Sequence, residues 1–340
     1  MSRAKWPHRL LAVFGRRPLA RNAHTTAPPP PPQLVPSPPS PTTAPPPLAQ
    51  QHGNLGGGGG IPGDEESALE RLTARMVACE RLPAAEVGAI LKAVAKLRLA
   101  DAVLQEAQRE FLVGELIAAE DGWTPSAASM CCYGLRAWSG QSLRAMLQAM
   151  PLKLIAVKDA FSSKDVGMAC FGLHCCDGDS EEVRAVLTAL LPHIQKCTET
   201  FERHTVGNSL YGLQRCGNSK EARDVLSALV PHIQRCTDAF SEQNVSTSLY
   251  GLQRLAVSQE ARDVLSALVP HIQRCTASFS GQGIGNSLYG LHRCGDSQEV
   301  RDVFAALLPH IRKCTDTFSV QEVSNSLYAL YALWRHSGSP

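Results

Sequence analysis

Four segments of the sequence carry one arrangement of side chains that could contact a single-stranded nucleic acid. The sets are His204, Asn208, Tyr211 and Arg215; Gln243, Thr247, Tyr250 and Arg254; Gln282, Asn286, Tyr289 and Arg293; and Gln321, Asn325 and Tyr328, followed by Ala332. The spacing i, i+4, i+7 and i+11 places each set on one face of a helix. An amide or hydroxyl can bind a base edge, a ring can stack on a base, and an arginine can bind a phosphate of RNA.

The same residues also have structural explanations. An aromatic ring persists at Tyr133 and Phe171, where polar partners give way to residues such as Met168 and Cys175. A packing role between repeats is therefore the alternative for the tyrosines. The three arginines end a predicted helix, where the helix dipole favours a cation. A solvated position on the surface is therefore the alternative for them.

The elements that must position these residues recur with a fixed period. Equivalent residues 39 positions apart are Leu210, Leu249, Leu288 and Leu327, and likewise Pro231, Pro270 and Pro309. Such a period indicates a solenoid of stacked repeats. The clear repeats are 161–200, 201–239, 240–278 and 279–317, followed by half of another. We expect an all-α fold, a right-handed α-solenoid of ~39-residue two-helix repeats.

Each repeat predicts two helices with recognisable starts. Ser241 is a predicted N-cap, and Val245, Leu249 and Leu252 form an apolar stripe behind it. The second helices are expected to begin at a recurring serine and to bury residues such as Leu265 and Leu268. These serines are Ser219, Ser258 and Ser297.

Glycine and proline recur inside these helices. Glycine in a helix costs about 1 kcal/mol relative to alanine, so its recurrence predicts close packing there. The glycines are Gly212, Gly251 and Gly290. Proline removes a helical hydrogen bond, so Pro231, Pro270 and Pro309 predict a kink or a short third helix.

The chain divides into four parts by composition. Residues 1–26 contain arginine and apolar residues without acids, which predicts an organellar presequence, mitochondrial or alternatively plastid. A disordered basic tail is the alternative. Residues 27–63 are rich in Pro and Gly and predict a disordered linker. Residues 64–160 predict diverged helical repeats, and 161–335 the regular repeats.

The charge of the chain is unevenly distributed. The whole chain has a net charge of +2, but residues 1–63 hold six Lys/Arg and no Asp or Glu. The remainder therefore holds 27 Lys/Arg against 31 Asp/Glu, a balance of −4. RNA-binding domains usually present a basic surface. This balance favours a protein-binding scaffold as the alternative function.

The cysteines and histidines predict structural roles. Equivalent cysteines lie about one repeat apart, beyond disulfide reach, and are expected to be small buried thiols. They are Cys197, Cys236, Cys275 and Cys314. The recurring histidines, which have no repeating nucleophile or carboxylate beside them, are His193, His232, His271 and His310. We expect no metal, cofactor, small-molecule substrate or catalytic residue, and hence no enzyme.

The core of the first helix resembles a known group of proteins. The Val-x-Asn-Ser-Leu-Tyr pattern, as in residues 206–213 and 323–330, resembles the octotricopeptide-type repeats and the helical repeats of RAP-domain and FAST-kinase-like proteins. The resemblance covers 123–335 and does not include a RAP domain. It implies an α-solenoid that binds single-stranded organellar RNA in the mitochondrial matrix and acts in RNA processing, stability or translation. The alternative partner is a protein of an organellar ribonucleoprotein. No membrane span is expected.

Overall fold

The computed structural model describes residues 63–97, 100–255 and 258–337 of the chain. Every regular element in these residues is a helix, and none is a strand. The predicted all-α class is therefore confirmed. The predicted presequence 1–26 and the Pro/Gly-rich segment as far as residue 62 lie outside the described residues.

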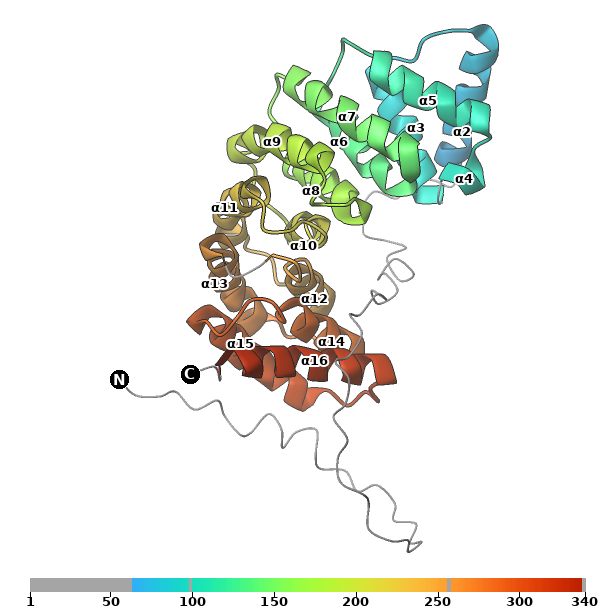
Figure 1. Cartoon of the computed structure of the whole chain (residues 1–340). Coiled ribbons are helices and arrows are strands. Elements are labelled where there is room, and N and C mark those ends of the chain that lie inside the picture. The colour runs from blue at the N-terminus through green and yellow to red at the C-terminus, as the bar shows by residue number, and fades with distance from the viewer. Residues whose placement is uncertain (1–62, 98–99, 256–257, 338–340) are drawn as a thin grey trace, which may run out of the picture. The chain divides into compact units, whose positions relative to one another are not determined.

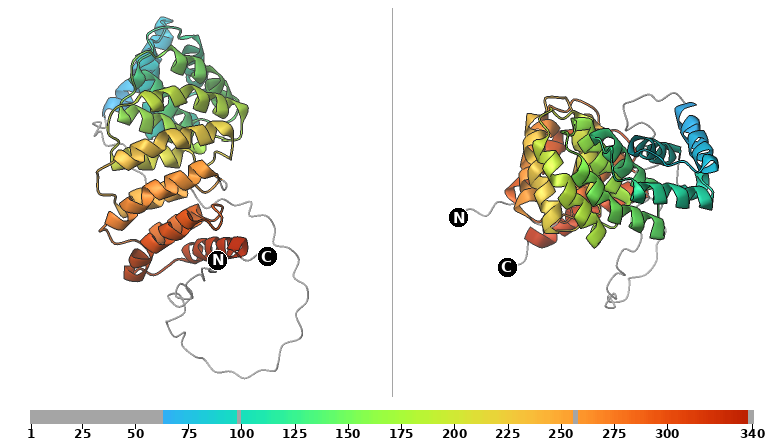
Figure 2. Two further views of the ribbon diagram at one scale, coloured as in Figure 1. Left: turned by 90° about the vertical axis from the view of Figure 1, so that its left-hand side faces the viewer. Right: turned by 90° about the horizontal axis from the view of Figure 1, so that it is seen from above.

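The helices stack in two layers (Figures 1 and 2). The first-helix layer contains α3 (Ala84–Leu97), α6 (Pro125–Gly134), α8 (Ser163–Gly172), α10 (Arg203–Gly212), α12 (Glu242–Tyr250), α14 (Gly281–Gly290) and α16 (Val320–Ser337). The second-helix layer contains α5 (Glu106–Ala118), α7 (Gly140–Ala156), α9 (Glu181–Lys196), α11 (Lys220–Arg235), α13 (Gln259–Arg274) and α15 (Gln298–Lys313). Each helix contacts the next one in its own layer. This is the arrangement of an α-solenoid.

The N-terminal end of the described region adds two helices to this pattern. The helix α2 (Gly63–Ala78) packs on α3 and α5, and the short α4 (Ala100–Val103) lies between those two in the chain. Two 3-10 turns, Leu135–Ala137 and Leu173–Cys175, follow α6 and α8. Within the described residues the stack therefore runs from α2 to α16.

The predicted helix starts are confirmed. The Ser241 hydroxyl accepts a hydrogen bond from the backbone N–H of Asn244, whose side chain bonds back to the serine. The second helices begin in the same way, because Ser219, Ser258 and Ser297 each accept a bond from the backbone three residues later. Each cap satisfies an N–H group that the helix itself leaves without a partner.

The predicted core is also confirmed. Val245, Leu249, Leu252, Leu265 and Leu268 are all buried. Val245 and Leu249 lie in α12, Leu252 in the turn that follows it, and the other two in α13, so each repeat closes its core between its own two helices and those of its neighbours. Burial of this kind supplies most of the stability of helices as short as α12.

The recurring glycines have the packing role predicted for them. A Cβ atom at Gly212 would overlap the carbonyl oxygen of Cys170 in the preceding first helix. The same overlap would occur between Gly251 and Leu210, and between Gly290 and Leu249. Neighbouring first helices therefore touch backbone to backbone at their C-terminal ends, and only glycine leaves room for this contact.

The predicted third helix at the recurring prolines is wrong. The second helices α11 and α13 continue through Pro231 and Pro270 without interruption. Both prolines are exposed, and so are Ser227 and Ser266, whose carbonyls the missing N–H groups would have paired with. Water can satisfy these carbonyls, so the helix tolerates the lost bond.

Candidate functional site

The aromatic residues of the first helices stack on one another. The ring centroids are 5.9 Å apart for Tyr133–Phe171, 5.7 Å for Phe171–Tyr211, 6.1 Å for Tyr211–Tyr250, 5.9 Å for Tyr250–Tyr289 and 6.2 Å for Tyr289–Tyr328. We call these six rings the aromatic column. Such separations are typical of favourable aromatic pairs. The column runs along the first-helix layer and links each repeat to the next.

The column leaves little ring surface for a ligand in the middle of the stack. Tyr211 is 1% exposed and Tyr250 is 7% exposed, and each ring lies between two others. Burial raises the pKa of Tyr211 to about 12 and also raises the pKa of Tyr250. Tyr289 is half-buried, and Tyr328, at the end of the column, is exposed. The arrangement favours a packing role for Tyr211 and Tyr250.

A second row of side chains, three residues after each ring, lies against the column. The guanidinium of Arg136 lies 4.3 Å from the Tyr133 ring centroid, and the His174 ring contacts both Phe171 and Tyr211. His292 contacts Tyr289 and Tyr328 in the same way. The residues of this row are Arg136, His174, Gln214, Gln253 and His292. Sequence reasoning missed them, although their fixed distance from the aromatic residue was a usable signal.

Glutamines in this row bond from one repeat to the next. Gln253 Nε2 donates to Gln214 Oε1 at 3.2 Å, and Gln214 Nε2 donates to the His174 carbonyl at 3.4 Å. The bonds join residues 39 and 40 positions apart. Both Gln214 and its bond to His174 are buried, so this row holds the repeats in register beside the aromatic column.

The polar residues predicted to read bases fall into two groups. Those nearest the helix N-terminus, His204, Gln243 and Gln321, are exposed, and Gln282 is half-buried. Those one turn further on are less accessible. In this second group Asn208 and Asn325 are half-buried, and Thr247 and Asn286 are buried. The four members of a predicted set therefore share a face, but they do not share exposure.

The predicted arginines form an exposed row held by the preceding repeat. Arg254 Nη1 donates to the Arg215 carbonyl at 3.3 Å, and Arg215 Nη1 donates to the Cys175 carbonyl at 3.2 Å. Arg293 is exposed at the equivalent position of the next repeat. Both accepting carbonyls lie just beyond the C-terminus of a first helix, where backbone acceptors lack helical partners. Each of these bonds uses one nitrogen of a group with five N–H donors.

The recurring histidines form the equivalent contacts in the second-helix layer, in agreement with the structural role predicted for them. Their Nε2 atoms lie within hydrogen-bonding distance of a carbonyl in the last turn of the preceding second helix. The pairs are His193–Leu154 at 2.9 Å, His232–Ile194 at 3.0 Å, His271–Ile233 at 2.9 Å and His310–Ile272 at 3.1 Å. Each ring also packs on the phenylalanine that opens its repeat, at 4.2–4.5 Å between centroids.

The hydrogen bonds determine the charge of two of these histidines. Arg235 Nη2 lies 3.0 Å from His232 Nδ1, and Arg274 Nη2 lies 3.1 Å from His271 Nδ1. An arginine can only donate, so Nδ1 accepts and Nε2 carries the proton that is donated to the carbonyl. The rings are therefore neutral. Burial lowers the pKa of His232 and His271, which is consistent with this assignment.

The cysteines are free thiols, and the burial predicted for the recurring ones is confirmed except at Cys314, which is half-buried. All twelve are unpaired, and Cys197, Cys236 and Cys275 are buried at the same repeat position. Burial raises the pKa of Cys170 and Cys216 to about 12, so these thiols are protonated at neutral pH. Within residues 63–337, apart from the gaps, no group of His, Cys, Asp or Glu side chains could hold a metal ion.

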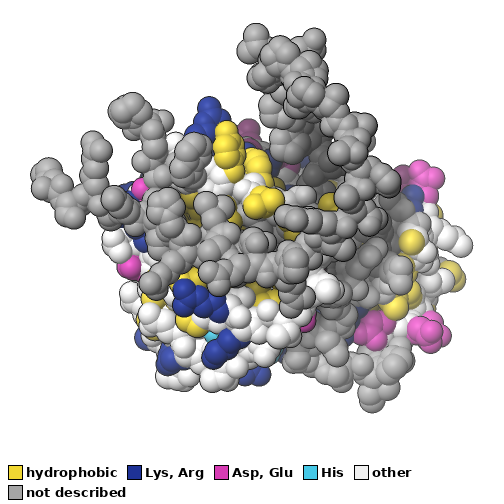
Figure 3. Space-filling view, turned by 90° about the horizontal axis from the view of Figure 1, so that it is seen from below, with side chains coloured by type: hydrophobic (Ala, Val, Ile, Leu, Met, Phe, Trp, Pro, Cys, Tyr) yellow, Lys and Arg dark blue, Asp and Glu magenta, His cyan; other side chains and the backbone are white. Residues whose placement is uncertain are grey.

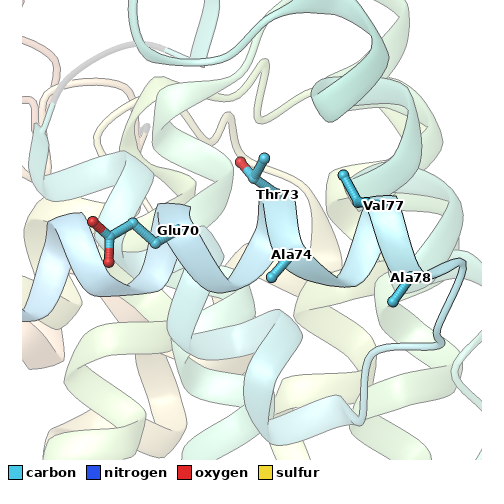
Figure 4. A pocket seen from close by; sticks show the side chains of 5 residues that line it. All are labelled: Glu70, Thr73, Ala74, Val77 and Ala78. Carbon is cyan, nitrogen blue, oxygen red and sulfur yellow. The ribbon is translucent and has the colours of Figure 1, made fainter.

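A hollow on α2 is lined by side chains of that helix alone, with a single carboxylate and no converging polar groups (Figure 4). Its lining residues are Glu70, Thr73, Ala74, Val77 and Ala78. None of the helices described is both long enough and apolar enough to cross a membrane.

Comparison with known proteins adds no relatives: no protein-family model matches the chain, and no curated protein matches it.

Proposed function

We propose that this chain is an organellar RNA-binding protein, a right-handed solenoid that holds a single strand of RNA along its first-helix layer. The observation that supports this function is the row of exposed arginines at successive repeats, Arg215, Arg254 and Arg293. Phosphate contacts supply much of the affinity of proteins for nucleic acids. A row with one cation per repeat suits a strand that follows the solenoid.

The carbonyl bonds of Arg215 and Arg254 favour this use of the side chains. Each bond fixes one end of a guanidinium and leaves its other N–H groups for a ligand. Ordering before binding lowers the entropy cost of contact. The buried tyrosines favour contact with the RNA backbone over reading of one base per repeat. His204, Gln243 and Gln321 are exposed polar side chains that could add base contacts.

The test compares two rows of cations in the full-length chain. Replacing Arg215, Arg254 and Arg293 together by Gln should weaken RNA binding. The slope of log affinity against log salt should shrink by about 0.7 for each lost contact to a single strand. The control makes the same replacement at Arg235, Arg274 and Lys313. These residues are exposed in the last turns of α11, α13 and α15, and their replacement should leave the slope unchanged.

Two outcomes would reject the assignment of the row. If the Arg215, Arg254 and Arg293 variant keeps its helicity and the wild-type salt slope, these arginines do not contact RNA and are solvated surface residues. If only the control variant loses RNA affinity, the RNA-binding surface is the second-helix layer and not the first.

The proposed compartment is the mitochondrial matrix, with the plastid as alternative, and the proposed role is RNA processing, stability or translation. The acid-free residues 1–26 motivate the compartment. Fused to a fluorescent reporter, this segment should direct import into mitochondria. A diffuse cytosolic signal would remove the mitochondrion from the proposal.

A protein-binding scaffold within an organellar ribonucleoprotein is the second candidate. The excess of acidic residues beyond residue 63 favours it, because RNA is repelled by negative charge. Absence of RNA binding by the full-length chain even at low salt would leave this candidate in place of the first. Neither proposed function includes a catalytic step.

A further inference from the structure

The ends of two neighbouring second helices, α5 and α7, carry exposed apolar side chains. Ile117 is 48% exposed, and Leu152 and Ile155 are 69% and 68% exposed. The two helix ends are adjacent, because the Lys153 ammonium of α7 donates to the Ile117 carbonyl of α5 at 2.9 Å. We call Ile117, Leu152 and Ile155 the apolar face. Neighbouring exposed apolar residues mark interaction sites more often than scattered ones do.

The regular repeats place other residues at the same exposed positions. Ile117 and Ile155 are each the next-to-last residue of their helix. In α9, α11, α13 and α15 the next-to-last residue is also exposed, and it is Gln195, Gln234, Gln273 or Arg312. At the position of Leu152, four residues before the helix end, the same helices carry an exposed proline. The repeat therefore folds with polar residues next to the helix end, and its packing does not account for the apolar face.

Exposed carboxylates flank the apolar face on the α5 side. Glu106 and Glu110 lie eleven and seven residues before Ile117, on the same stripe of α5. Glu120 and Asp121 follow the end of that helix. All four are exposed, and among the described residues none of their carboxylates forms an ion pair or a hydrogen bond. An apolar ligand seated on Ile117 would therefore have acidic side chains on both sides.

Exposed cations are fewer here and lie toward α9. Lys158 is exposed after α7, next to the exposed Asp159. The next second helix ends in the exposed Lys196, where α5 and α7 end in Ala118 and Ala156. Figure 3, which views the molecule from the α16 end, shows the larger groups of Asp and Glu beside hydrophobic side chains on the right, the side of α5 in Figure 1. Most of the Lys and Arg side chains visible there lie on the left.

We propose that the apolar face binds an amphipathic helix of a partner protein, in which Lys and Arg flank the apolar stripe. Packed neighbouring helices lie about 8–10 Å apart, and residues i and i+7 of one helix are about 10.5 Å apart. A helix laid along the stack therefore places two apolar side chains on Ile117 and Ile155, and the residue between them beside Leu152. Such spaced anchors are the usual mode of recognition of an amphipathic helix.

Charge complementarity selects this partner over other occupants. The flanks of the bound helix face Glu110 on one side and Glu120 on the other, so Lys and Arg there gain pairing and steering toward the face. A second copy of this chain would bring the same carboxylates against them, and an anionic membrane or a nucleic acid would be repelled. The face lies on the second-helix layer, so the proposal does not depend on RNA bound along the row of Arg215 and Arg254.

The experiment measures binding of a fluorescent helical peptide to the full-length chain by anisotropy. The peptide has about 18 residues, five helical turns, with leucine at i, i+3, i+4 and i+7 and lysine elsewhere. A peptide of the same composition in scrambled order is its control and should bind about tenfold more weakly or worse. Ile117→Gln combined with Ile155→Gln should weaken binding by about tenfold or more. This variant keeps the fold, because three regular repeats carry glutamine at that position.

A second pair of variants tests the charges. Glu110→Gln with Glu120→Gln should weaken binding and reduce its dependence on salt, because two attractions that salt screens are lost. The matched control is Glu181→Gln with Asp263→Asn, which removes the same charge from exposed positions on α9 and α13. It should bind the peptide as the wild type does.

Four results would overturn the proposal. The first is a wild-type chain that binds the two peptides equally, and the second is unchanged binding in the double isoleucine variant. The third is self-association of the wild type that this variant abolishes, which would assign the face to a second copy. The fourth is tighter peptide binding after Arg16→Gln with Arg17→Gln, which would assign it to the basic N-terminal segment of the chain itself.

Discussion

The diverged region 64–160 and the regular region 161–335 form the same contact between neighbouring repeats, here called a joint, from different side chains. In the regular region a neutral histidine packs on a phenylalanine and donates to the end of the preceding second helix, as His232 does with Phe201 and Ile194. In the diverged region Lys153 takes this role. Its ammonium lies 5.7 Å from the Trp123 ring centroid and donates to the carbonyls of Ile117, at 2.9 Å, and Ala119.

The first-helix layer shows the same exchange. Arg136 lies over the rings of Tyr133 and Phe171 and donates to the Ala95 carbonyl at 2.7 Å. Its counterparts in the regular region are His174, Gln214, Gln253 and His292, and of these Gln214 and Gln253 donate hydrogen bonds to the preceding repeat. The diverged region therefore uses a lysine and an arginine where the regular region uses histidine and glutamine.

The comparison shows that each joint needs a hydrogen-bond donor for a carbonyl at a helix end, and that several residue types can supply this donor. The last carbonyls of every helix lack intrahelical partners, and a buried acceptor without a donor costs about 1–3 kcal/mol. Histidine, lysine, arginine and glutamine can all reach such a carbonyl. An aromatic ring beside the donor packs against it in either chemistry, by ring stacking or by a cation–π contact.

The largest expected difference between the regions concerns the residue before each ring of the aromatic column. Leu249→Ala should destabilise the fold by about 2–5 kcal/mol, because the leucine is fully buried. Cys132→Ala, at the equivalent and equally buried position, removes one atom and should cost much less. Denaturant unfolding measures both. In hydrogen exchange, the loss of protection caused by Leu249→Ala should centre on residues 201–317. Equal unfolding costs for the two variants, or unchanged protection in residues 201–317, would contradict this packing assignment.

A smaller difference is expected for the glycines at the joints. Gly251→Ala should cost about 1–3 kcal/mol, because its new Cβ overlaps the Leu210 carbonyl and two backbones must separate. Gly134→Ala, whose nearest obstacle is the Leu91 Cβ at 2.6 Å, should cost less. The control is Gly114→Ala, with no atom within 4 Å of the added Cβ, which should stabilise α5 by about 0.5–1 kcal/mol. Thermal unfolding of the three variants would show the order, and a harmless Gly251→Ala would refute the backbone contact.

The smallest expected effect is a dependence on pH confined to the regular region. Burial lowers the pKa of His193, His232 and His271 below the value of the unfolded chain, about 6.5. The unfolded chain then takes up protons more readily, so these histidines stabilise the fold above about pH 6.5. That contribution is lost as the pH falls through the lowered folded values.

The diverged region provides the internal control for this effect. Residues 64–160 contain no histidine, and burial lowers the pKa of Lys153 from a normal value of about 10.4. Hydrogen exchange, corrected for its intrinsic pH dependence, should show protection of α11 and α13 falling between about pH 7.5 and about pH 5.5, with α5 and α7 little changed. Equal losses in both regions would mean that the histidine joints are not the titrating element.

The local structure was predictable from the sequence because its causes lie a few residues apart. The caps at Ser241 and Ser258, the stripe through Leu249 and the close approach at Gly251 all follow from spacing within one helix. The continuous helix through Pro270 did not follow, because the effect of a proline depends on whether the carbonyl it leaves unpaired meets water. That depends on which face the proline occupies.

The candidate site was predictable only as a face. Periodicity placed Tyr211 on one helix face with His204 and Arg215. It does not show whether the ring packs against a neighbouring ring or is exposed to solvent. The pairing of Lys153 with Trp123 was hidden for another reason. Neither residue type recurs, so the period that identified His193 and Phe161 carried no signal for them.

The hydrogen bonds between repeats connect residues separated by nearly constant distances along the chain. They span 38 or 39 residues at the histidines and 39 or 40 at the glutamines and arginines. A tandem duplication of one period in the gene, beginning at any codon within the regular region, therefore creates a repeat whose joints are complete on both sides. Unequal recombination can lengthen or shorten such an array in whole repeats without compensating substitutions, and the near identity of 219–236 and 258–275 is what recent events of this kind would leave.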